Sequence, residues 1–469
     1  MRKFLLLVIT ILFITFETCF SQNEAEFNLD LKFGALSNGE DALPFWQSAN
    51  TYGRITRNTA AYGLVSSSYR FAIADSSSIK FKGAAFFRDK DDSNIFIDEL
   101  YASWSNSFLE VNVGVKHDDL FYNGLSSSNR SILWSNNARS VPGISIKTTK
   151  PLYLFFNKHL GFEGRFSEYL LNDERLVENT RVHHKYLALV YKFSKNSHFK
   201  VGVRHIAEYG GKSNDPAIGD QPTGLSDYVK VFFGRAGGDN ALETDQLNAI
   251  GNHIGSYELS YNRFIGETEL EVFYNSIFED GSGSAMRNFP DGRYGVFYDN
   301  HKKDQLVSSF VYEFIYTKNQ SQTAPHLWDS YFRHGIYQSG WTYQQSTIGI
   351  PFITPTYLSD FAKGFITIGN NRLIAHHLGV MGKLFFPYTM KLSYRRNYGF
   401  NQNTAYLKYK HYDPDDERSS YKIASEVIST YLDVQLLNTF ISLNLNVAAD
   451  FTSDNSNFAA GLSVSKSFF

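Results

Sequence analysis

Short stretches in which apolar and polar residues alternate recur along the chain. The clearest lie at residues 27–33, 109–116 and 441–447, and looser ones at 79–88 and 199–208. Successive side chains of a β-strand point to opposite faces, so one face of each stretch meets apolar surroundings and the other meets water. Each stretch is close to the roughly 9–11 residues with which a tilted strand crosses a bilayer. The pattern therefore predicts membrane-spanning antiparallel strands.

Helical periodicity is scarce. The best candidate is residues 173–186, where Leu176, Val177, Thr180 and His184 would share one face of a helix. We therefore expect at most a minor helical component in an all-β fold.

Polar segments between the strands differ in length. Residues 76–78 and 89–94 read as polar turns, a long connection runs from residue 210 to about 228, and residues 280–284 form another break. The acidic segment 411–420 lacks the ligand spacing and central glycine of a calcium-binding EF-hand, so we interpret it as a solvated loop. Long and short connections that alternate along antiparallel strands are typical of outer-membrane barrels.

The two ends of the chain carry export signals. Arg2-Lys3 precedes the apolar run 4–16, and we expect a signal peptide at residues 1–21, cleaved after Ser21. A lipoprotein would instead use Cys19, the one cysteine of the chain, but the residues before it make a poor lipidation signal. Residues 22–469 would then form one barrel domain without cysteine. The alternating segment 458–469 is similar to the closing strand of outer-membrane barrels.

Composition narrows the class of protein. The chain has 469 residues, with 45 Lys+Arg against 47 Asp+Glu, and this balance argues against a nucleic-acid partner. Aromatic residues make up 16% although the mean hydropathy is −0.30. A membrane barrel explains this combination, because only every second residue meets lipid and aromatic girdles ring both interfaces. With 448 residues after cleavage (469 − 21), the chain suits roughly 16 to 18 strands.

Several clusters, in order along nearly the whole mature chain, resemble the capsule-assembly Wzi family in its Bacteroidetes-type form. The clusters are Pro44-Phe45-Trp46 with Asn50; the segment 126–146; His183-His184-Lys185-Tyr186; the segment 251–257; the segment 278–283; Tyr331-Phe332; Tyr337; Gly340-Trp341; the segment 348–351; Asn370-Asn371-Arg372; and His376-His377.

This resemblance implies an outer-membrane β-barrel of 18 strands with a small helical plug at the periplasmic end. It also implies a non-enzymatic, lectin-like protein that binds or organises exported capsular polysaccharide at the cell surface. We expect a monomer whose partners are outer-membrane lipid and surface polysaccharide, with exposed loops and without a cofactor.

Catalytic and metal sites find weak support. His253 and Ser256 are near each other, but on a strand they point to opposite faces, and a G-x-S-x-G motif is missing. Glu279-Asp280 could serve glycan hydrolysis, although adjacent residues on a strand also point apart. The pairs His183-His184 and His376-His377 lack the spacing of zinc ligands. We therefore expect neither catalysis nor a bound metal.

Glycan binding needs aromatic faces and polar groups that converge on hydroxyls. The residues that we expect to contact polysaccharide are Trp46, Asn50, Asn252, His253, Tyr337, Trp341, Arg372, Arg395 and Arg396. The simpler interpretation places such aromatic residues in the interface girdles and such charges in lumen ion pairs. Three other functions stay open at this point: a diffusion porin, an outer-membrane hydrolase and a soluble secreted lectin.

Overall fold

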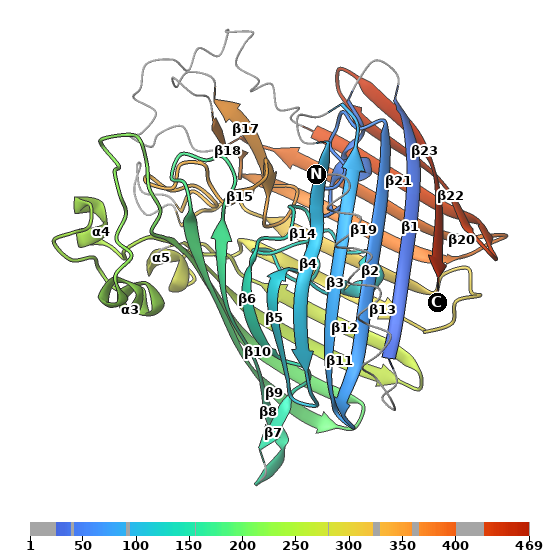
Figure 1. Cartoon of the computed structure of the whole chain (residues 1–469), viewed down its shortest axis with the longest axis horizontal. Helices are drawn as coiled ribbons and strands as arrows, with labels where there is room; N and C mark the ends of the chain where they lie inside the picture. Colours follow the sequence, from blue (N-terminus) through green and yellow to red (C-terminus); the bar gives the residue numbers. More distant parts are fainter. Residues whose placement is uncertain are drawn as a thin grey trace, which may run out of the picture.

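The computed structural model describes residues 25–38, 42–90, 94–154, 156–279, 281–321, 329–358, 365–399 and 426–468. Nineteen strands of this part of the chain belong to one antiparallel sheet that curves into a barrel (Figure 1). The predicted signal peptide and the acidic segment 411–420 lie outside the described residues, so both stay predictions.

The barrel strands are, in chain order, β1 (Ala25–Asn38), β2 (Ala61–Ala74), β3 (Ser77–Arg88), β4 (Ile95–Ser105), β5 (Leu109–Val115), β6 (Gly143–Thr148), β7 (Leu152–Leu154), β8 (Asn157–Leu171), β9 (Thr180–Ser194), β10 (Ser197–Tyr209), β11 (Asn252–Ile265), β12 (Thr268–Asn275), β13 (Gly292–Asp299), β14 (Ser309–Tyr316), β19 (Leu373–Lys383), β20 (Pro387–Asn397), β21 (Glu426–Asn438), β22 (Ser442–Thr452) and β23 (Ser456–Phe468). Two small hairpins lie in the connection after β14, and they consist of β15 (Thr342–Tyr343) with β16 (Ser346–Thr347), and β17 (Thr354–Leu358) with β18 (Phe365–Asn370).

The sheet closes on itself. Strand β1 pairs with β2 on one side and with β23 on the other, where Leu29 lies opposite Phe468. Strands β6 and β7 both pair with β8 and follow each other along it, so they occupy one position in the wall. The barrel therefore has 18 strand positions, and this confirms the predicted strand number. It also confirms that the C-terminal segment is the closing strand.

The two ends of the barrel differ in their connections. At one end, which we call the tight-turn end, residues 75–76, 195–196 and 266–267 join neighbouring strands. At the other, the long-loop end, the chain makes connections such as 116–142 and 317–372. The predicted alternation of long and short connections is confirmed.

Side chains alternate across the wall as the pattern predicts. On β9, Leu187, Leu189 and Tyr191 are exposed on the outside, while Ala188 and Val190 between them are fully buried. On the closing strand, Phe458 and Leu462 are exposed in the same way. Strand β9 also shows that the predicted helix at residues 173–186 is wrong, because residues 180–194 are extended and hydrogen-bonded to β8 and β10.

The helices that the structure describes are short and lie in long-loop connections. They are α2 (Phe45–Ser48), α3 (Leu225–Phe233), α4 (Glu243–Leu247), α5 (Gly281–Ser284) and the 3-10 turn η1 (Tyr122–Gly124). Among the described residues, none of these helices has the length and apolar character needed to cross a bilayer. The predicted small helical plug thus differs from what is seen, because the described residues place no helix at the tight-turn end. The interior is filled by loops instead.

An apolar core lies inside the long-loop half of the barrel. It is built from the connections 42–60, 116–142 and 329–353, which fold inward and pack against the wall. The Trp341 indole, with no exposed surface, donates from Nε1 to the Leu133 carbonyl at 2.7 Å. The Ile350 amide donates to the Ile132 carbonyl at 3.1 Å. We call these three connections the loop plug.

Candidate functional site

The sequence-predicted glycan residues of the first connection belong to the loop plug. Trp46 of α2 is buried and donates from Nε1 to Ser393 Oγ of β20 at 3.0 Å. Asn50 adopts a left-handed backbone conformation (φ 56°), which asparagine tolerates better than most residues. Its amide donates to the Ser127 carbonyl at 2.9 Å. Both side chains therefore have structural partners, Trp46 on the wall and Asn50 within the plug.

Asn252 and His253 point in opposite directions, as neighbours on β11 must. The Asn252 amide faces the lumen and donates to Glu208 Oε2 at 2.7 Å. His253 lies on the outside of the wall, where Nδ1 is 2.9 Å from Nε2 of His205 and Nε2 is 2.9 Å from the Ile250 carbonyl. The structure therefore separates these two predicted contacts.

Tyr337 and Trp341 lie in the third connection of the plug. The buried Tyr337 hydroxyl donates to the Gly210 carbonyl at 3.1 Å. Together with the fully buried Trp341, it packs in the protein interior.

The three predicted arginines lie on β20 or directly before β19, at the long-loop end. The guanidinium of Arg395 stacks 4.1 Å over the ring of Phe45, next to Trp46. Arg396, on the opposite face of β20, is half-exposed, and its Nε is 3.6 Å from Glu426 Oε1. The Arg372 backbone amide donates to the Gly399 carbonyl at 3.0 Å. Of the nine predicted residues, the structure thus brings Trp46 and Arg395 together across Phe45.

Below the loop plug, toward the tight-turn end, the lumen widens into a chamber of about 480 Å³. This lies within the roughly 300–1,000 Å³ of typical small-molecule sites. The chamber is lined by charged residues of both signs, with aromatic residues among them. The charged wall residues are Glu110, Lys147, Lys150, Glu163, Arg165, Lys200, Arg204, Glu258, Glu271 and Arg293, and the plug adds Asp118, Asp119, Phe121, Tyr122, Arg130 and Trp134.

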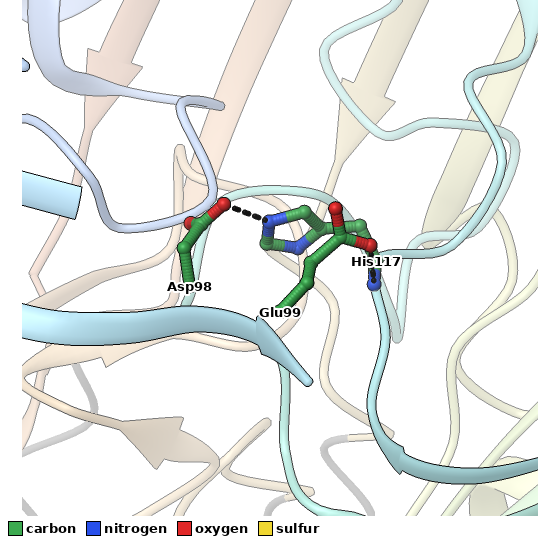
Figure 2. A group of neighbouring side chains, drawn as sticks. All are labelled: Asp98, Glu99 and His117. Carbon is green, nitrogen blue, oxygen red and sulfur yellow. Dashed lines mark hydrogen bonds and ion pairs between the residues drawn. The ribbon is translucent and has the colours of Figure 1, made fainter. Parts of the chain in front are cut away.

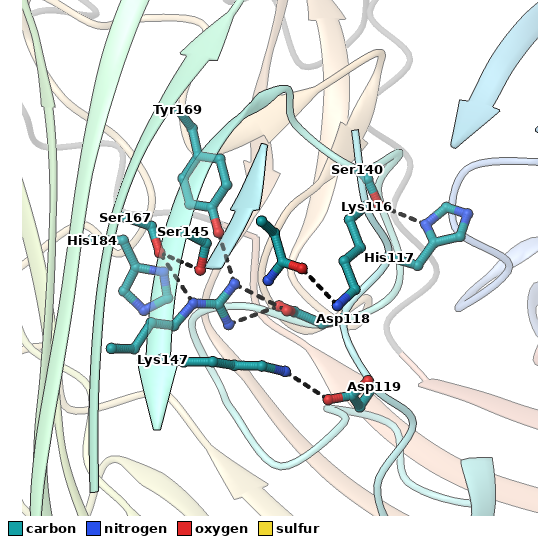
Figure 3. A network of polar contacts seen from close by, with 12 residues as sticks. Lys116, His117, Asp118, Asp119, Ser140, Ser145, Lys147, Ser167, Tyr169 and His184 are labelled. Carbon is teal, nitrogen blue, oxygen red and sulfur yellow. Dashed lines mark hydrogen bonds and ion pairs between the residues drawn. The ribbon is translucent and has the colours of Figure 1, made fainter. Parts of the chain in front are cut away.

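Ion pairs across the chamber fasten the 116–142 connection to the wall. Asp118 accepts two hydrogen bonds from Arg165 of β8, at 2.9 and 3.1 Å. Asp119 accepts one from Lys147 of β6 at 2.7 Å (Figure 3). Burial acts to raise the pKa of the Asp118 carboxyl, but the Arg165 guanidinium outweighs it and holds this pKa below its usual value. Asp118 therefore stays ionised and keeps its bidentate partner.

The same connection reaches the opposite wall. Arg130 pairs with Glu271 of β12 at 3.2 Å, and the Tyr122 hydroxyl donates to the same carboxylate at 3.1 Å. The hydroxyl groups of Ser126, Ser127 and Ser128 donate to Glu313 of β14 at 2.6 to 2.8 Å. The connection thus spans the lumen from β5 to β14 and is held there by polar contacts on both sides.

Sequence reasoning missed these chamber residues. A signal exists in the spacing, because Lys200 and Arg204 on β10 and Glu258 on β11 occupy alternate, lumen-facing positions. Their partners on other strands could not be read without the register. Arg204, for example, donates to Glu258 Oε1 at 2.7 Å, and the two residues are 54 positions apart.

One acidic group resembles a metal site. Asp98, Glu99 and His117 present ligand atoms within 4.8 Å of one another, and Figure 2 shows both carboxylates turned toward His117. A register shift between β3 and β4 at Ala84/Ala85 explains why the adjacent residues Asp98 and Glu99 are both buried.

Positively charged side chains already pair with both carboxylates. Arg54 donates to both oxygens of Asp98, at 2.8 and 2.6 Å, and Arg54 Nη2 is also 3.2 Å from His117 Nε2. Lys82 pairs with Glu99. A divalent ion would face the Arg54 charge at close range, so the donor set does not fit a metal.

Comparisons with known proteins agree with the barrel architecture. The structure of Wzi from Escherichia coli is described as that of an outer-membrane, carbohydrate-binding β-barrel involved in group 1 capsule assembly. It is 11% identical, has a TM-score of 0.57 and matches 93% of this chain and 83% of its own. OmpF from Salmonella typhi (7% identity, TM-score 0.42, 95% and 98% covered) and OccK5 from Pseudomonas aeruginosa (11%, 0.43, 95% and 98%) are also similar.

No curated protein matches the chain. The model of the capsule assembly protein Wzi family, however, matches residues 38–353, which is more than half of the chain and includes most of the plug and chamber. This protein is therefore a closed β-barrel that belongs to the capsule assembly Wzi family.

Proposed function

We propose that this protein holds exported capsular or other surface polysaccharide on the outside of the outer membrane, without catalysing a reaction. The observation that carries the proposal is the family match over residues 38–353, combined with a lumen closed by an apolar core. A barrel closed in this way is suited to retain a polymer rather than to pass it. The carbohydrate-binding description of the solved Wzi barrel supports the choice of ligand.

The orientation follows from the connections. Outer-membrane barrels have short turns in the periplasm and long loops outside, so we place the long-loop end at the cell surface. At this end two cations lie near the ring of Tyr398, with Lys318 Nζ at 4.0 Å and the Arg396 guanidinium at 5.5 Å from its centroid. We call these three residues the rim cluster. It offers an aromatic side chain with positive charge, which suits a sugar that carries a carboxylate.

Retention of a long polymer does not require tight binding of one sugar. Each sugar repeat can bind weakly, because one polymer carries many repeats and can contact many copies of the protein. Once one repeat is bound, binding of the next repeat of the same polymer is effectively intramolecular. The predicted monomer is sufficient for this arrangement.

The residues that favoured a hydrolase have structural partners. Glu279 accepts the Phe332 amide of the plug. His253 is engaged with His205 and Ile250 on the outside of the wall, whereas the fully buried Ser256 faces the lumen. These contacts support a non-catalytic protein. His253 and Ser256 lie on opposite sides of the wall, so His253 cannot act as the general base for the Ser256 hydroxyl.

Deleting the gene and comparing cell-bound with shed polysaccharide tests the proposal. We expect the deletion to move polymer from the cell-bound to the shed fraction while total synthesis stays constant, and re-expression to restore retention. Unchanged retention would remove the role. Loss of total polymer, or shortened chains that depend on Glu279 or His253, would instead favour an enzyme.

A diffusion porin is the alternative to this function. We expect the purified protein to be silent in planar bilayers because the loop plug fills the lumen. Steady, open channels would contradict the proposed closed barrel.

A further inference from the structure

Helix α3 lies outside the barrel, against the outer surface of β8–β10 near the long-loop end (Figure 1). The Tyr228 hydroxyl donates to Glu168 Oε1 at 2.6 Å. The ring of Phe232 packs 5.1 Å from that of His183, and the Phe232 carbonyl accepts from Lys185. The helix is thus fixed to the wall by one of its faces.

The wall beneath α3 is polar, although it faces outward. Glu168, His183, Lys185, His205 and Tyr209 occupy the outward positions of β8, β9 and β10 at this height. Closer to the tight-turn end, the outward positions of the same strands become exposed and apolar, with Leu187 and Leu189 on β9 and Val201 and Val203 on β10. Helix α3 therefore lies directly beyond the exposed apolar part of these strands, on the side of the long-loop end.

The side of α3 that does not touch the wall is apolar. Leu225, Val229 and Phe233 follow one another at intervals of four residues and are 81%, 45% and 63% exposed. On a helix this spacing places them on one face. Ser226 is exposed and Lys230 is half-exposed beside this stripe, and they give the helix a polar edge.

We propose that α3 is an interfacial membrane helix, whose stripe of Leu225, Val229 and Phe233 is immersed among the acyl chains of the outer leaflet. Polar side chains that face hydrocarbon without partners are costly. Here α3 covers His183, contacts Glu168 and presents an apolar stripe on its outer side, while Leu187 and Leu189 lie exposed farther along β9. An apolar helix face over polar wall residues stabilises the protein only where the surroundings are apolar.

The arrangement of charge fits the same orientation. Positive charge accompanies the stripe, because Lys230 lies on the polar edge and Arg235 follows directly after the helix. Basic residues beside the apolar face are typical of interfacial helices. The apolar side of an interfacial helix is buried roughly 5–10 Å below the headgroups, and nine residues of α3 suffice for this shallow position. The inference rests on the membrane barrel and is independent of the polysaccharide role.

Spin labels at single cysteines test the proposal in the full-length protein reconstituted in lipid vesicles. Because the expected mature chain, residues 22–469, contains no cysteine, each introduced cysteine is the single labelling site. The labelled variants would be Val229→Cys on the stripe, Leu189→Cys in the lipid-facing band, and Asp239→Cys in the exposed connection after α3. Collision rates with oxygen, which partitions into lipid, and with a water-soluble nickel chelate give the depth of each label.

We expect the label at residue 229 to be oxygen-accessible and nickel-protected like that at 189, with a depth of roughly 5–10 Å, while that at 239 is nickel-accessible. Nickel access at 229 equal to that at 239 would overturn the proposal. Protection from both reagents, or dipolar broadening between labels, would also overturn it, because the stripe would then contact a second copy or another protein.

A paired substitution gives a second measurement. Leu225→Glu with Phe233→Glu changes side chains that point away from the wall, so the barrel is expected to fold. We expect this change to make the label at 229 nickel-accessible, whereas Ser226→Glu on the polar edge leaves it protected. An equal response to both changes would contradict insertion of the stripe.

Discussion

Arg293 and Glu313 form a 2.7 Å ion pair on the inner side of neighbouring strands, and neither side chain has exposed surface. The pair holds the loop plug as well as the wall, because Glu313 also accepts hydrogen bonds from Ser126, Ser127 and Ser128. Arg293 Nη1 donates in addition to Asn275 Oδ1 at 2.6 Å. A single buried carboxylate thus joins β13, β14 and the connection that crosses the lumen.

Glu313→Gln should destabilise the barrel strongly. Removing one partner of a buried ion pair typically costs about 3–5 kcal/mol, because the other charge is left without compensation. Denaturant unfolding followed by tryptophan fluorescence measures the loss. The matched control is Glu267→Gln in the exposed turn 266–267, for which we expect a change within about 0.5 kcal/mol. Equal effects of the two substitutions would show that Glu313 does not hold the plug.

Trp341→Ala should loosen the plug. Replacing a fully buried tryptophan by alanine costs about 3–5 kcal/mol through lost contacts and the cavity that remains, and it also leaves the Leu133 carbonyl without its donor. We expect faster hydrogen exchange in the 116–142 connection and brief conductance events in planar bilayers. Trp104→Ala, on the outside of β4, serves as the control and should leave the lumen silent.

His334 should make the plug sensitive to acid. It lies in the connection after β14, where its Nδ1 accepts from the Ile336 amide at 3.2 Å. Burial lowers the pKa of His334 from 6.5 to about 4. The unfolded chain therefore takes up the proton first, so the stability that the neutral imidazole contributes is complete above pH 6.5 and is lost as the pH falls toward 4.

Hydrogen exchange at residues 336–337, corrected for its intrinsic pH dependence, measures this effect. We expect protection to fall between pH 7 and pH 5 in the native protein. His334→Asn keeps an acceptor but does not titrate, and it should remove the pH dependence. His301→Asn, in an exposed turn, should leave it intact. Identical profiles for all three proteins would exclude His334 as the cause.

Charge at the rim cluster should matter for polysaccharide retention. We expect Arg396→Glu with Lys318→Glu to weaken binding of an acidic polymer by roughly fivefold for each lost contact of about 1 kcal/mol. The loss should shrink at high salt, since exposed charges are screened. Lys302→Glu lies in the 300–308 turn at the tight-turn end and is the control. If neither the rim-cluster variant nor the Lys302→Glu control changes binding, the ligand binds elsewhere on the surface.

Divalent metals should not stabilise the protein through Asp98, Glu99 and His117. Arg54 and Lys82 already pair with the two carboxylates. We expect neither zinc nor a chelator to move the thermal unfolding midpoint. A midpoint that rises with zinc and falls with Asp98→Asn would contradict this reading of the group.

Local pattern was enough to predict the wall. The alternation at 199–208 corresponds to β10, and the segment 458–469 contains most of the closing strand. Successive side chains of a strand point alternately outward and into the barrel, so a difference between the two environments appears in the sequence as a period of two. The wrong helix at 173–186 shows the limit of such patterns. His183 and His184 are both buried, since α3 covers His183 from outside while His184 faces the lumen, and this mixture hides the strand alternation.

The interior could not be predicted in the same way. Ser127 meets Glu313 across 186 positions of sequence, and Asn50 meets Ser127 across 77. Neither contact produces a repeating pattern of polar and apolar residues that could be recognised in the sequence. Trp46 and Trp341 were expected to bind sugar because they are large and aromatic, and the plug uses the same properties for packing. That expectation for the nine residues stays a prediction, alongside the structural partners that each has.

The distant origins of the plug segments have a consequence for biogenesis. Gln47 of the first connection donates to Asn446 on β22, and Trp46 donates to Ser393 on β20. Neither acceptor is available until the C-terminal strands arrive. The contacts that anchor the first connection can therefore form only once β20 and β22 are in place. An assembly intermediate that lacks the C-terminal strands would leave Trp46 and Gln47 without these two acceptors.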